Sequence, residues 1–127
     1  WYAEILSYHL SLNPDYVVEI FHSATDFLNN LHRRPNLITL DYSLPDTNGG
    51  DLLKKIKSQY PDIPVVIISG QEDIATAVKL LKEGAYDYIV KDDDAKERIW
   101  NTVMHARENS NLRDEITQLK EEIGKKY

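Results

Sequence analysis

Three side chains that could carry out phosphorus chemistry follow predicted strands in this sequence: Asp41, Ser69 and Lys91. Because the carboxyl ends of parallel strands meet at one edge of a sheet, we expect these side chains to lie close together. A carboxylate can attack phosphorus and form an acyl phosphate, while an ammonium and a hydroxyl stabilise the transferred group. A divalent cation such as Mg²⁺ normally completes a site of this kind. A single aspartate after a strand is more often a helix cap or a turn former, so the prediction rests on all three residues together.

The elements that must position these side chains follow from the alternation of hydrophobic patterns along the chain. Aromatic, β-branched or continuous apolar runs predict strands at residues 16–21, 37–40, 65–68 and 86–90. Helical patterns are predicted at residues 1–12, after Ser23, after Asp51, at residues 73–83 and after Asp94. Strands that alternate with helices and short loops imply a parallel sheet with helices on both faces.

Local signals predict where several of these elements begin and end. Ser23 and Asp26 form a capping-box pattern, Asp51 can cap the helix that follows it, and Gly84 stands where a left-handed C-cap is needed. A doubly wound domain usually opens with a strand, whereas this sequence opens with a helical pattern and no initiator Met. We therefore expect one further strand before Trp1.

Composition narrows the classes of function. The chain has 127 residues and a formal charge of −6, which argues against direct nucleic-acid contact by this segment. The absence of cysteine excludes disulfides, thiol catalysis and cysteine-ligated zinc. The longest apolar run is strand-sized, well below the roughly 18 residues that a membrane-spanning helix requires, so no membrane association is expected.

Three segments, in the same order as in the family, resemble the receiver domain of response regulators in two-component signalling. They are residues 37–49, 65–70 and 84–91. In the first segment, Pro45 and Gly49 follow Asp41 by four and eight residues, like the loop-shaping residues of the family's phosphoacceptor loop. The resemblance covers about residues 1–106. It implies a doubly wound parallel α/β sheet of the flavodoxin-like class with strand order 2-1-3-4-5, the first strand being absent from this sequence.

The resemblance implies a cytoplasmic phosphorylation switch. A sensor histidine kinase would transfer a phosphoryl group to Asp41, where Lys91 and Ser69 would contact it. Ser69 would move toward the phosphoryl oxygens, and the aromatic switch residue Tyr88 would rotate into the space released. The face formed by residues 73–83, residues 86–90 and the start of the last helix would then repack and change dimerisation. Beyond slow self-phosphorylation and dephosphorylation, no enzyme activity is implied.

The same resemblance implies Mg²⁺ bound by Asp41, by the backbone carbonyl of Ser43 and by an acidic pair at the end of the family's first strand. That pair is expected upstream of Trp1 and is absent from the sequence, which we interpret as a truncated chain. A second departure is that Asp92 follows Lys91, where the family usually has a proline with a cis bond. The peptide bond after Lys91 is therefore expected to be trans.

The last 21 residues, 107–127, are predicted to form a helical linker with a possible coiled coil. Apolar residues recur there at intervals of 4, 3 and 4, in the order Leu112, Ile116, Leu119 and Ile123. Asn109 falls at an a position of this heptad, where a buried Asn favours a parallel dimer. The extension resembles the linker of nitrogen-regulator-type sigma-54-dependent transcription activators and implies a homodimer that controls a transcriptional output domain.

Two alternatives remain open on the residues alone. One is a phosphorylation-independent pseudo-receiver that acts as a dimerisation or interaction module, which the missing acidic pair favours only if the natural chain starts at Trp1. The other is a metal-dependent phosphatase on the same fold, which the lack of a further acid or base near the trio disfavours. The intact Asp41, Ser69 and Lys91 favour the phosphoacceptor, because a module that needs no phosphate has no use for them.

Overall fold

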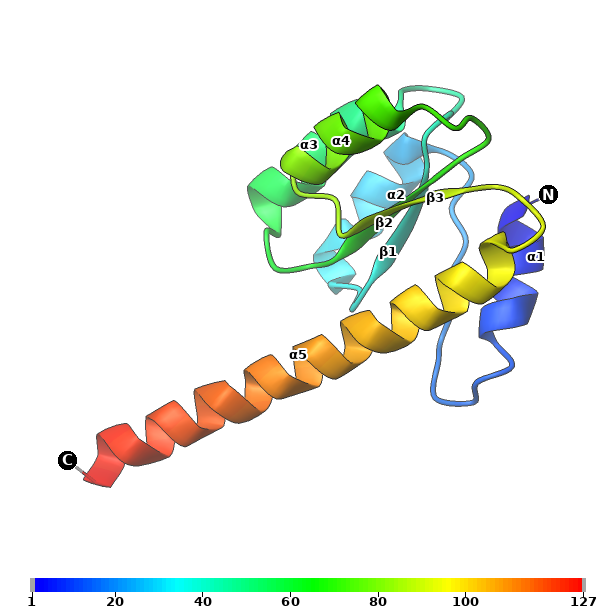
Figure 1. Cartoon of the computed structure of the whole chain (residues 1–127). Helices are drawn as coiled ribbons and strands as arrows, with labels where there is room; N and C mark the ends of the chain where they lie inside the picture. Colours follow the sequence, from blue (N-terminus) through cyan, green and yellow to red (C-terminus); the bar gives the residue numbers. More distant parts are fainter. Residues whose placement is uncertain (1, 127) are drawn as a thin grey trace.

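The chain folds around a parallel sheet of three strands in the order β1-β2-β3 (Figure 1). The structure is a computed structural model that describes residues 2–126. The strands are β1 (Ile38–Asp41), β2 (Val65–Ser69) and β3 (Asp87–Val90). The helices are α1 (Tyr2–Leu10), α2 (Ala24–Asn30) with a 3-10 turn at Leu31–Arg33, α3 (Gly49–Gln59), α4 (Ile74–Lys82) and α5 (Ala95–Lys126).

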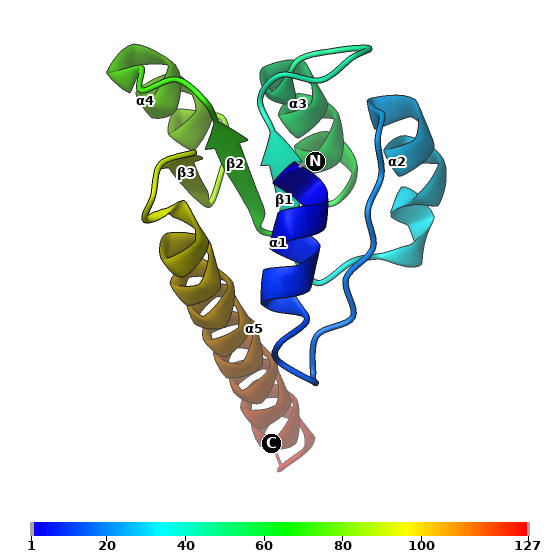
Figure 2. The same cartoon turned by 90° about the vertical axis from the view of Figure 1, so that its right-hand side faces the viewer.

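Helices cover both faces of the sheet, as the alternating pattern predicts (Figure 2). All five residues of the central strand β2 are buried, which explains its continuous apolar run. On one face Ile67 packs with side chains of α2, α3 and α4, among them Leu52 and Leu80. On the other face Ile68 packs with α1 and α5, among them Leu6 and Ile99. The doubly wound α/β class is therefore confirmed.

The ends of the helices follow the local signals with one exception. The Ser23 hydroxyl caps α2 by accepting the Asp26 amide at 3.2 Å, and Gly84 has a φ of 111° just after α4. The assignment of Asp51 as the cap of α3 is wrong. The helix begins at Gly49, and the Asn48 side chain accepts the Asp51 amide at 2.9 Å.

The predicted strand at residues 16–21 is also wrong, because this segment forms no strand in the structure. It is extended, but it pairs with no neighbour among the described residues, and Val17 is 92% exposed. A strand exists only where a second strand takes up its backbone hydrogen bonds. The sheet ends at β1, and no described strand lies between β1 and this segment. The sheet consequently has three strands rather than the four expected.

The last helix, α5, continues well past the body of the domain, as its heptad pattern predicts (Figure 1). Its first half is buried against the sheet through Ile99, Val103 and Ala106. The four apolar residues of its second half are 51–58% exposed, namely Leu112, Ile116, Leu119 and Ile123. In the described residues no helix is long and apolar enough to cross a membrane.

Candidate functional site

Asp41 and Lys91 meet at the carboxyl edge of the sheet. The Lys91 Nζ atom lies 2.5 Å from the Asp41 Oδ2 atom, and the two side chains are 24% and 36% exposed. Hydrogen bonds just beyond the strands align the two residues: the Tyr42 amide donates to the Ile68 carbonyl, and the Lys91 amide donates to the Ser69 carbonyl. The predicted meeting of carboxylate and ammonium is therefore present.

Ser69 ends β2, the strand that lies between β1 and β3. It is 4% exposed, and its Oγ atom accepts the Gln71 amide at 3.2 Å. An accepting hydroxyl keeps its proton for donation to another group. The edge thus brings together a carboxylate, an ammonium and a buried hydroxyl on three adjacent strands, as the sequence predicts.

The loop after Asp41 is held close to the strand end. The Ser43 amide donates to the Asp41 Oδ1 atom at 3.1 Å, and the Gly49 amide donates to the Tyr42 carbonyl at 2.7 Å. A Cβ atom on Gly49 would lie 2.8 Å from the Tyr42 Cα atom, so this approach requires glycine. Pro45, the other predicted loop-shaping residue, is exposed.

Asp46 in the same loop is a residue that sequence reasoning missed. Its carboxylate accepts the backbone amides of Ala24 and Thr25, both at 3.0 Å, and the Thr25 hydroxyl at 2.9 Å. These hydrogen bonds lower the pKa of the Asp46 carboxyl. The loop is thereby joined to the start of α2, more than 20 residues earlier in the chain. The sequence around Asp46 is that of a short polar turn and does not indicate a contact with residues as distant as Ala24 and Thr25.

Tyr88, the predicted switch residue, connects β3 to the loop after β2. Its ring is half-buried against the core on the α3 and α4 side, and its hydroxyl donates to the Gln71 carbonyl at 2.9 Å. The Gln71 amide in turn donates to Ser69, as described above. Tyr88 is therefore two hydrogen bonds away from the buried hydroxyl of the site.

Tyr2 is a second residue that the sequence did not single out. Its ring lies 4.8 Å from the Lys91 Nζ atom, within the range of a cation–π contact. Burial raises the pKa of the Tyr2 hydroxyl, and the nearby Asp92 carboxylate adds to the effect. Tyr2 and Lys91 are 89 positions apart in the sequence, and only the fold brings them together.

The described residues fit a Mg²⁺ site only in part. No group of three or more His, Asp or Glu side chains that could hold a metal ion occurs in the part of the chain that the structure describes. Asp41 offers one carboxylate, and the Ser43 carbonyl is the other predicted ligand. Mg²⁺ needs about six oxygen ligands, some of them waters, so this donor set is incomplete.

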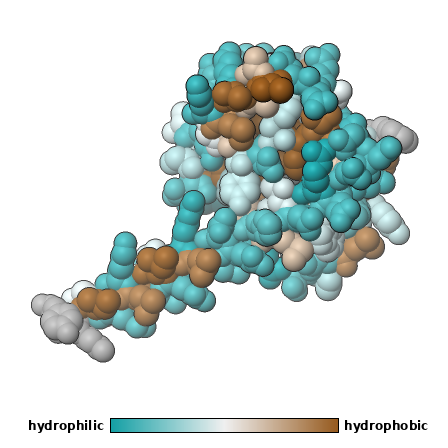
Figure 3. Space-filling model, in the orientation of Figure 1, coloured by the Kyte–Doolittle hydropathy of each residue, from teal (hydrophilic) through white to brown (hydrophobic). Residues whose placement is uncertain are grey.

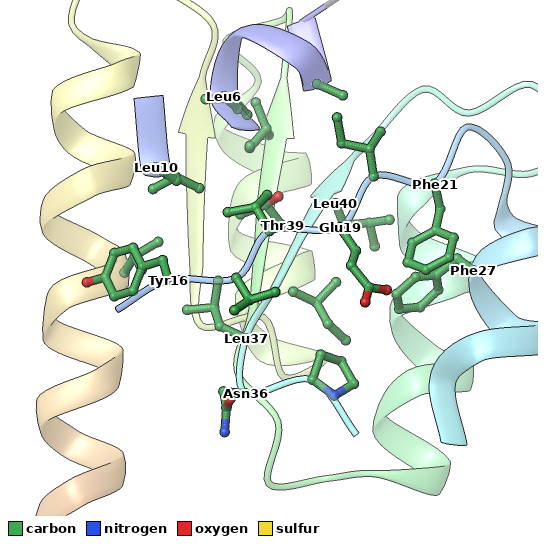
Figure 4. Close-up of a pocket in the computed structure, with 18 of the residues that line it drawn as sticks. Leu6, Leu10, Tyr16, Glu19, Phe21, Phe27, Asn36, Leu37, Thr39 and Leu40 are labelled. Atoms are coloured by element: carbon green, nitrogen blue, oxygen red, sulfur yellow. The ribbon is translucent and has the colours of Figure 1, made fainter. Parts of the chain in front are cut away.

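A cavity of about 780 Å³ extends from the site along the outer edge of β1 (Figure 4). Its lining includes Asp41, Thr39 and Leu40 of β1 on one side and the extended segment 16–21 on the other, with Leu6 and Leu10 of α1 nearby. Only one edge of β1 is paired, because the sheet ends there. The cavity therefore lies where a further strand would join β1 to residues 16–21.

Comparison with known proteins gives a consistent result. Residues 2–103 match the model of the response regulator receiver domain family. The chain is 45% identical over 91 residues to the nitrogen assimilation regulatory protein NtrX of Azorhizobium caulinodans, covering 70% of this chain and 20% of that protein. It is 35% identical over 111 residues to the regulatory protein LuxO of Vibrio vulnificus, covering 86% of this chain and 24% of that protein. The chain thus spans less than a quarter of the length of these relatives.

A solved structure extends the likeness to the fold. The receiver domain of NtrX from Brucella abortus superposes with a TM-score of 0.74 at 33% identity, covering 83% of this chain and 88% of that one. The expected flavodoxin-like receiver fold is confirmed by this likeness and by the parallel sheet. β1, β2 and β3 correspond to the last three positions of the expected order 2-1-3-4-5.

Proposed function

We propose that this chain, which belongs to the response regulator receiver domain family, accepts a phosphoryl group on Asp41 from a sensor histidine kinase. The observation that carries the proposal is the contact of the Lys91 ammonium with the Asp41 carboxylate at the edge of the sheet. An Asp41 carboxylate oxygen attacks phosphorus, the oxygen–phosphorus bond forms, and the bond from phosphorus to the kinase imidazole nitrogen breaks. The imidazole leaves with the bonding electron pair.

Lys91 and Ser69 have distinct roles in this proposal. The Lys91 ammonium neutralises charge on the transferred phosphoryl oxygens, because it already lies within hydrogen-bond distance of the acceptor carboxylate. The Ser69 hydroxyl donates a hydrogen bond to one of those oxygens when its loop moves. Because the Gln71 amide donates to Ser69 and the Gln71 carbonyl accepts from Tyr88, that movement also displaces Tyr88.

Mg²⁺ belongs to the proposal as the cofactor. Receiver domains generally bind Mg²⁺. The Asp41 carboxylate and the Ser43 carbonyl are the groups of this chain that would hold the ion, together with carboxylates that the described residues do not supply. The ion would supply positive charge to the phosphoryl oxygens.

The proposal also includes a homodimer and a division of the chain at residue 106. Residues 107–127 act as a linker helix, and the exposed seam of α5 pairs in parallel with a second copy. In that register Glu108 faces the partner's Arg113, and Glu115 faces the partner's Lys120. The exposed apolar residues Val78 and Leu81 of α4 extend the contact surface on the domain. An output domain that regulates transcription would follow the linker.

One observation favours a second function, in which the chain is a pseudo-receiver that needs no phosphate. The described residues bring one carboxylate, rather than a cluster, to the predicted metal site. The seam and the α4 surface would then serve dimerisation alone. The two functions differ in a single measurable property, the modification of Asp41.

Incubation of the full-length protein with acetyl phosphate and Mg²⁺, followed by intact-mass measurement, tests the proposal. We expect a mass gain of one phosphoryl group for the wild type and none for Asp41→Asn. Asp93→Asn is the matched control, because Asp93 is exposed after β3 and has no predicted role in the site. A wild type that gains no mass, with Asp41→Asn unchanged in every respect, would establish the pseudo-receiver instead.

A further inference from the structure

We propose that Asn109 has two alternative partners, the Tyr86 hydroxyl of its own domain and the partner's Asn109, and that this choice sets where the coiled coil begins. The inference rests on the proposed dimer but adds a regulatory contact to it. In the structure the Asn109 Nδ2 atom donates to the Tyr86 Oη atom at 3.0 Å. The predicted a-position residue is therefore already bound to the domain.

The position of Asn109 on the surface of α5 explains why the two partners compete. Each residue turns a helix by roughly 100°, so residues three positions apart lie about 60° apart around the axis and are neighbours on the surface. Asn109 lies three residues after the buried Ala106 and three before the exposed Leu112. It also lies seven residues before Ile116, within about 20° of that side chain around the helix axis. Asn109 thus belongs to the seam and borders the buried face at the same time.

The ring of Tyr86 stands where a second helix would approach. Paired helices lie about 8–10 Å apart, so a partner helix at the level of Asn109 would meet the Tyr86 ring. Tyr86 is 38% exposed, precedes β3 and belongs to neither hydrophobic core cluster, so turning its ring outward would not open the core. While Tyr86 holds Asn109, pairing starts at Leu112. When Tyr86 turns away, pairing extends through Asn109 to His105, the preceding d position.

The exposed apolar stripe begins where this contact ends. Brown side chains follow the outer part of the helix in Figure 3, and they correspond to the seam residues from Leu112 onward. Before Asn109 the same side of α5 is tied to the domain, since the Thr102 hydroxyl donates to the Asp87 carboxylate at 3.2 Å. Hydrogen bonds to the domain therefore hold the residues of α5 that come just before Leu112.

Cross-linking through introduced cysteines tests the inference cleanly, because the chain has no cysteine of its own. His105→Cys and Leu112→Cys each place a thiol at a d position, where the two copies of a parallel dimer approach within disulfide distance. Each is oxidised in the wild-type background, in Tyr86→Phe, which removes the hydroxyl, and in Tyr86→Ala, which also removes the ring. Tyr8→Phe is the control, because Tyr8 is an exposed tyrosine of α1.

Leu112→Cys is expected to cross-link in every background. His105→Cys should cross-link slowly with Tyr86 present, about twofold to tenfold more in Tyr86→Phe, and more again in Tyr86→Ala. The inference is overturned if the Tyr86 variants leave cross-linking at His105 unchanged or reduce it while Leu112→Cys still cross-links. That result would still support the dimer. Absence of cross-linking at Leu112 together with a monomer in sedimentation overturns the dimer and the inference with it. Neither result bears on phosphorylation of Asp41.

Discussion

The carboxylate of Asp46 accepts the backbone amide of Ala24, the first residue of α2, at 3.0 Å. The loop that follows Asp41 therefore caps the N-terminus of α2. Ser23, the residue just before α2, caps the helix in the usual way by accepting the Asp26 amide, and Asp46 from a distant loop accepts the two amides before it. The start of α2 is therefore held both by its own cap and by the loop after β1.

The Asp46 contact predicts a dependence of stability on pH. Its hydrogen bonds stabilise the charged form, so the pKa in the folded chain lies below the unfolded value of about 3.9. Its contribution is present above that unfolded value and is lost as the pH falls through the lower folded pKa. Urea unfolding between pH 7 and pH 3 should show Asp46→Ala less stable than wild type at pH 7, with the difference shrinking in acid. A constant difference, or equal loss for Asp93→Ala, would contradict the linkage.

Lys91 is predicted to be essential for the response of Asp41. Lys91→Ala removes the ammonium that lies on the acceptor carboxylate, so phosphorylation by acetyl phosphate should slow by about a hundredfold. Lys82→Ala, at the exposed end of α4, is the matched control and should leave the rate unchanged. The rate is followed by intact-mass measurement over time. Equal rates for the two variants would remove Lys91 from the proposed mechanism.

Gly49 is predicted to be a position where even one methyl group is costly. The Gly49→Ala variant would place a Cβ atom 2.8 Å from the Tyr42 Cα atom, which is backbone and cannot turn aside. We expect a loss of about 1–3 kcal/mol in the free energy of unfolding, measured with urea. Gly70→Ala is the control, because a Cβ atom there meets nothing within 4 Å. A loss of the same size in both variants would point to glycine flexibility instead of the close approach.

The exposed seam of α5 predicts a dimer that a single charge can break. Ile116→Asp places a charge in the middle of the seam, so the dimer should dissociate at concentrations where wild type is paired, in sedimentation experiments. Its circular dichroism should be close to that of wild type, because Ile116 is 51% exposed in the single chain. Thr117→Asp, one residue on and off the seam, should stay dimeric. A wild-type chain that is monomeric at all concentrations would contradict the prediction.

Sequence reasoning succeeded where the determining interactions are local. The capping by Ser23, the left-handed turn at Gly84 and the burial of β2 each depend on a few neighbouring residues. The meeting of Asp41, Ser69 and Lys91 was also predictable, because strand polarity alone sends them to one edge. For α3, two polar residues three positions apart, Asn48 and Asp51, were both candidates for the cap. The Asn48 side chain is the cap, because its oxygen accepts the Asp51 amide. Its side-chain amide in turn donates to the Asp51 carboxylate.

The failures share a different cause, which is dependence on distant segments. Residues 16–21 have strand composition, yet a strand needs a neighbour, and no described segment supplies one. The contact of Asp46 with Ala24 and that of Asn109 with Tyr86 each join residues more than 20 positions apart. Heptad spacing predicts Asn109 as a seam residue. The heptad spacing gave no indication that Asn109 would donate a hydrogen bond to Tyr86 of the domain.

The unbroken course of α5 has a mechanical consequence. Its 32 residues, at about 1.5 Å each, make a rod of about 48 Å that begins beside Lys91 and ends far outside the domain. Because the helix is continuous, a turn of its first half about its own axis would also turn the side chains of its second half, Ile123 among them. A domain attached to the end of α5 would sense a rotation about the helix axis rather than a change of distance. A signal of that kind survives changes in linker length by whole heptads and is scrambled by the insertion of one or two residues.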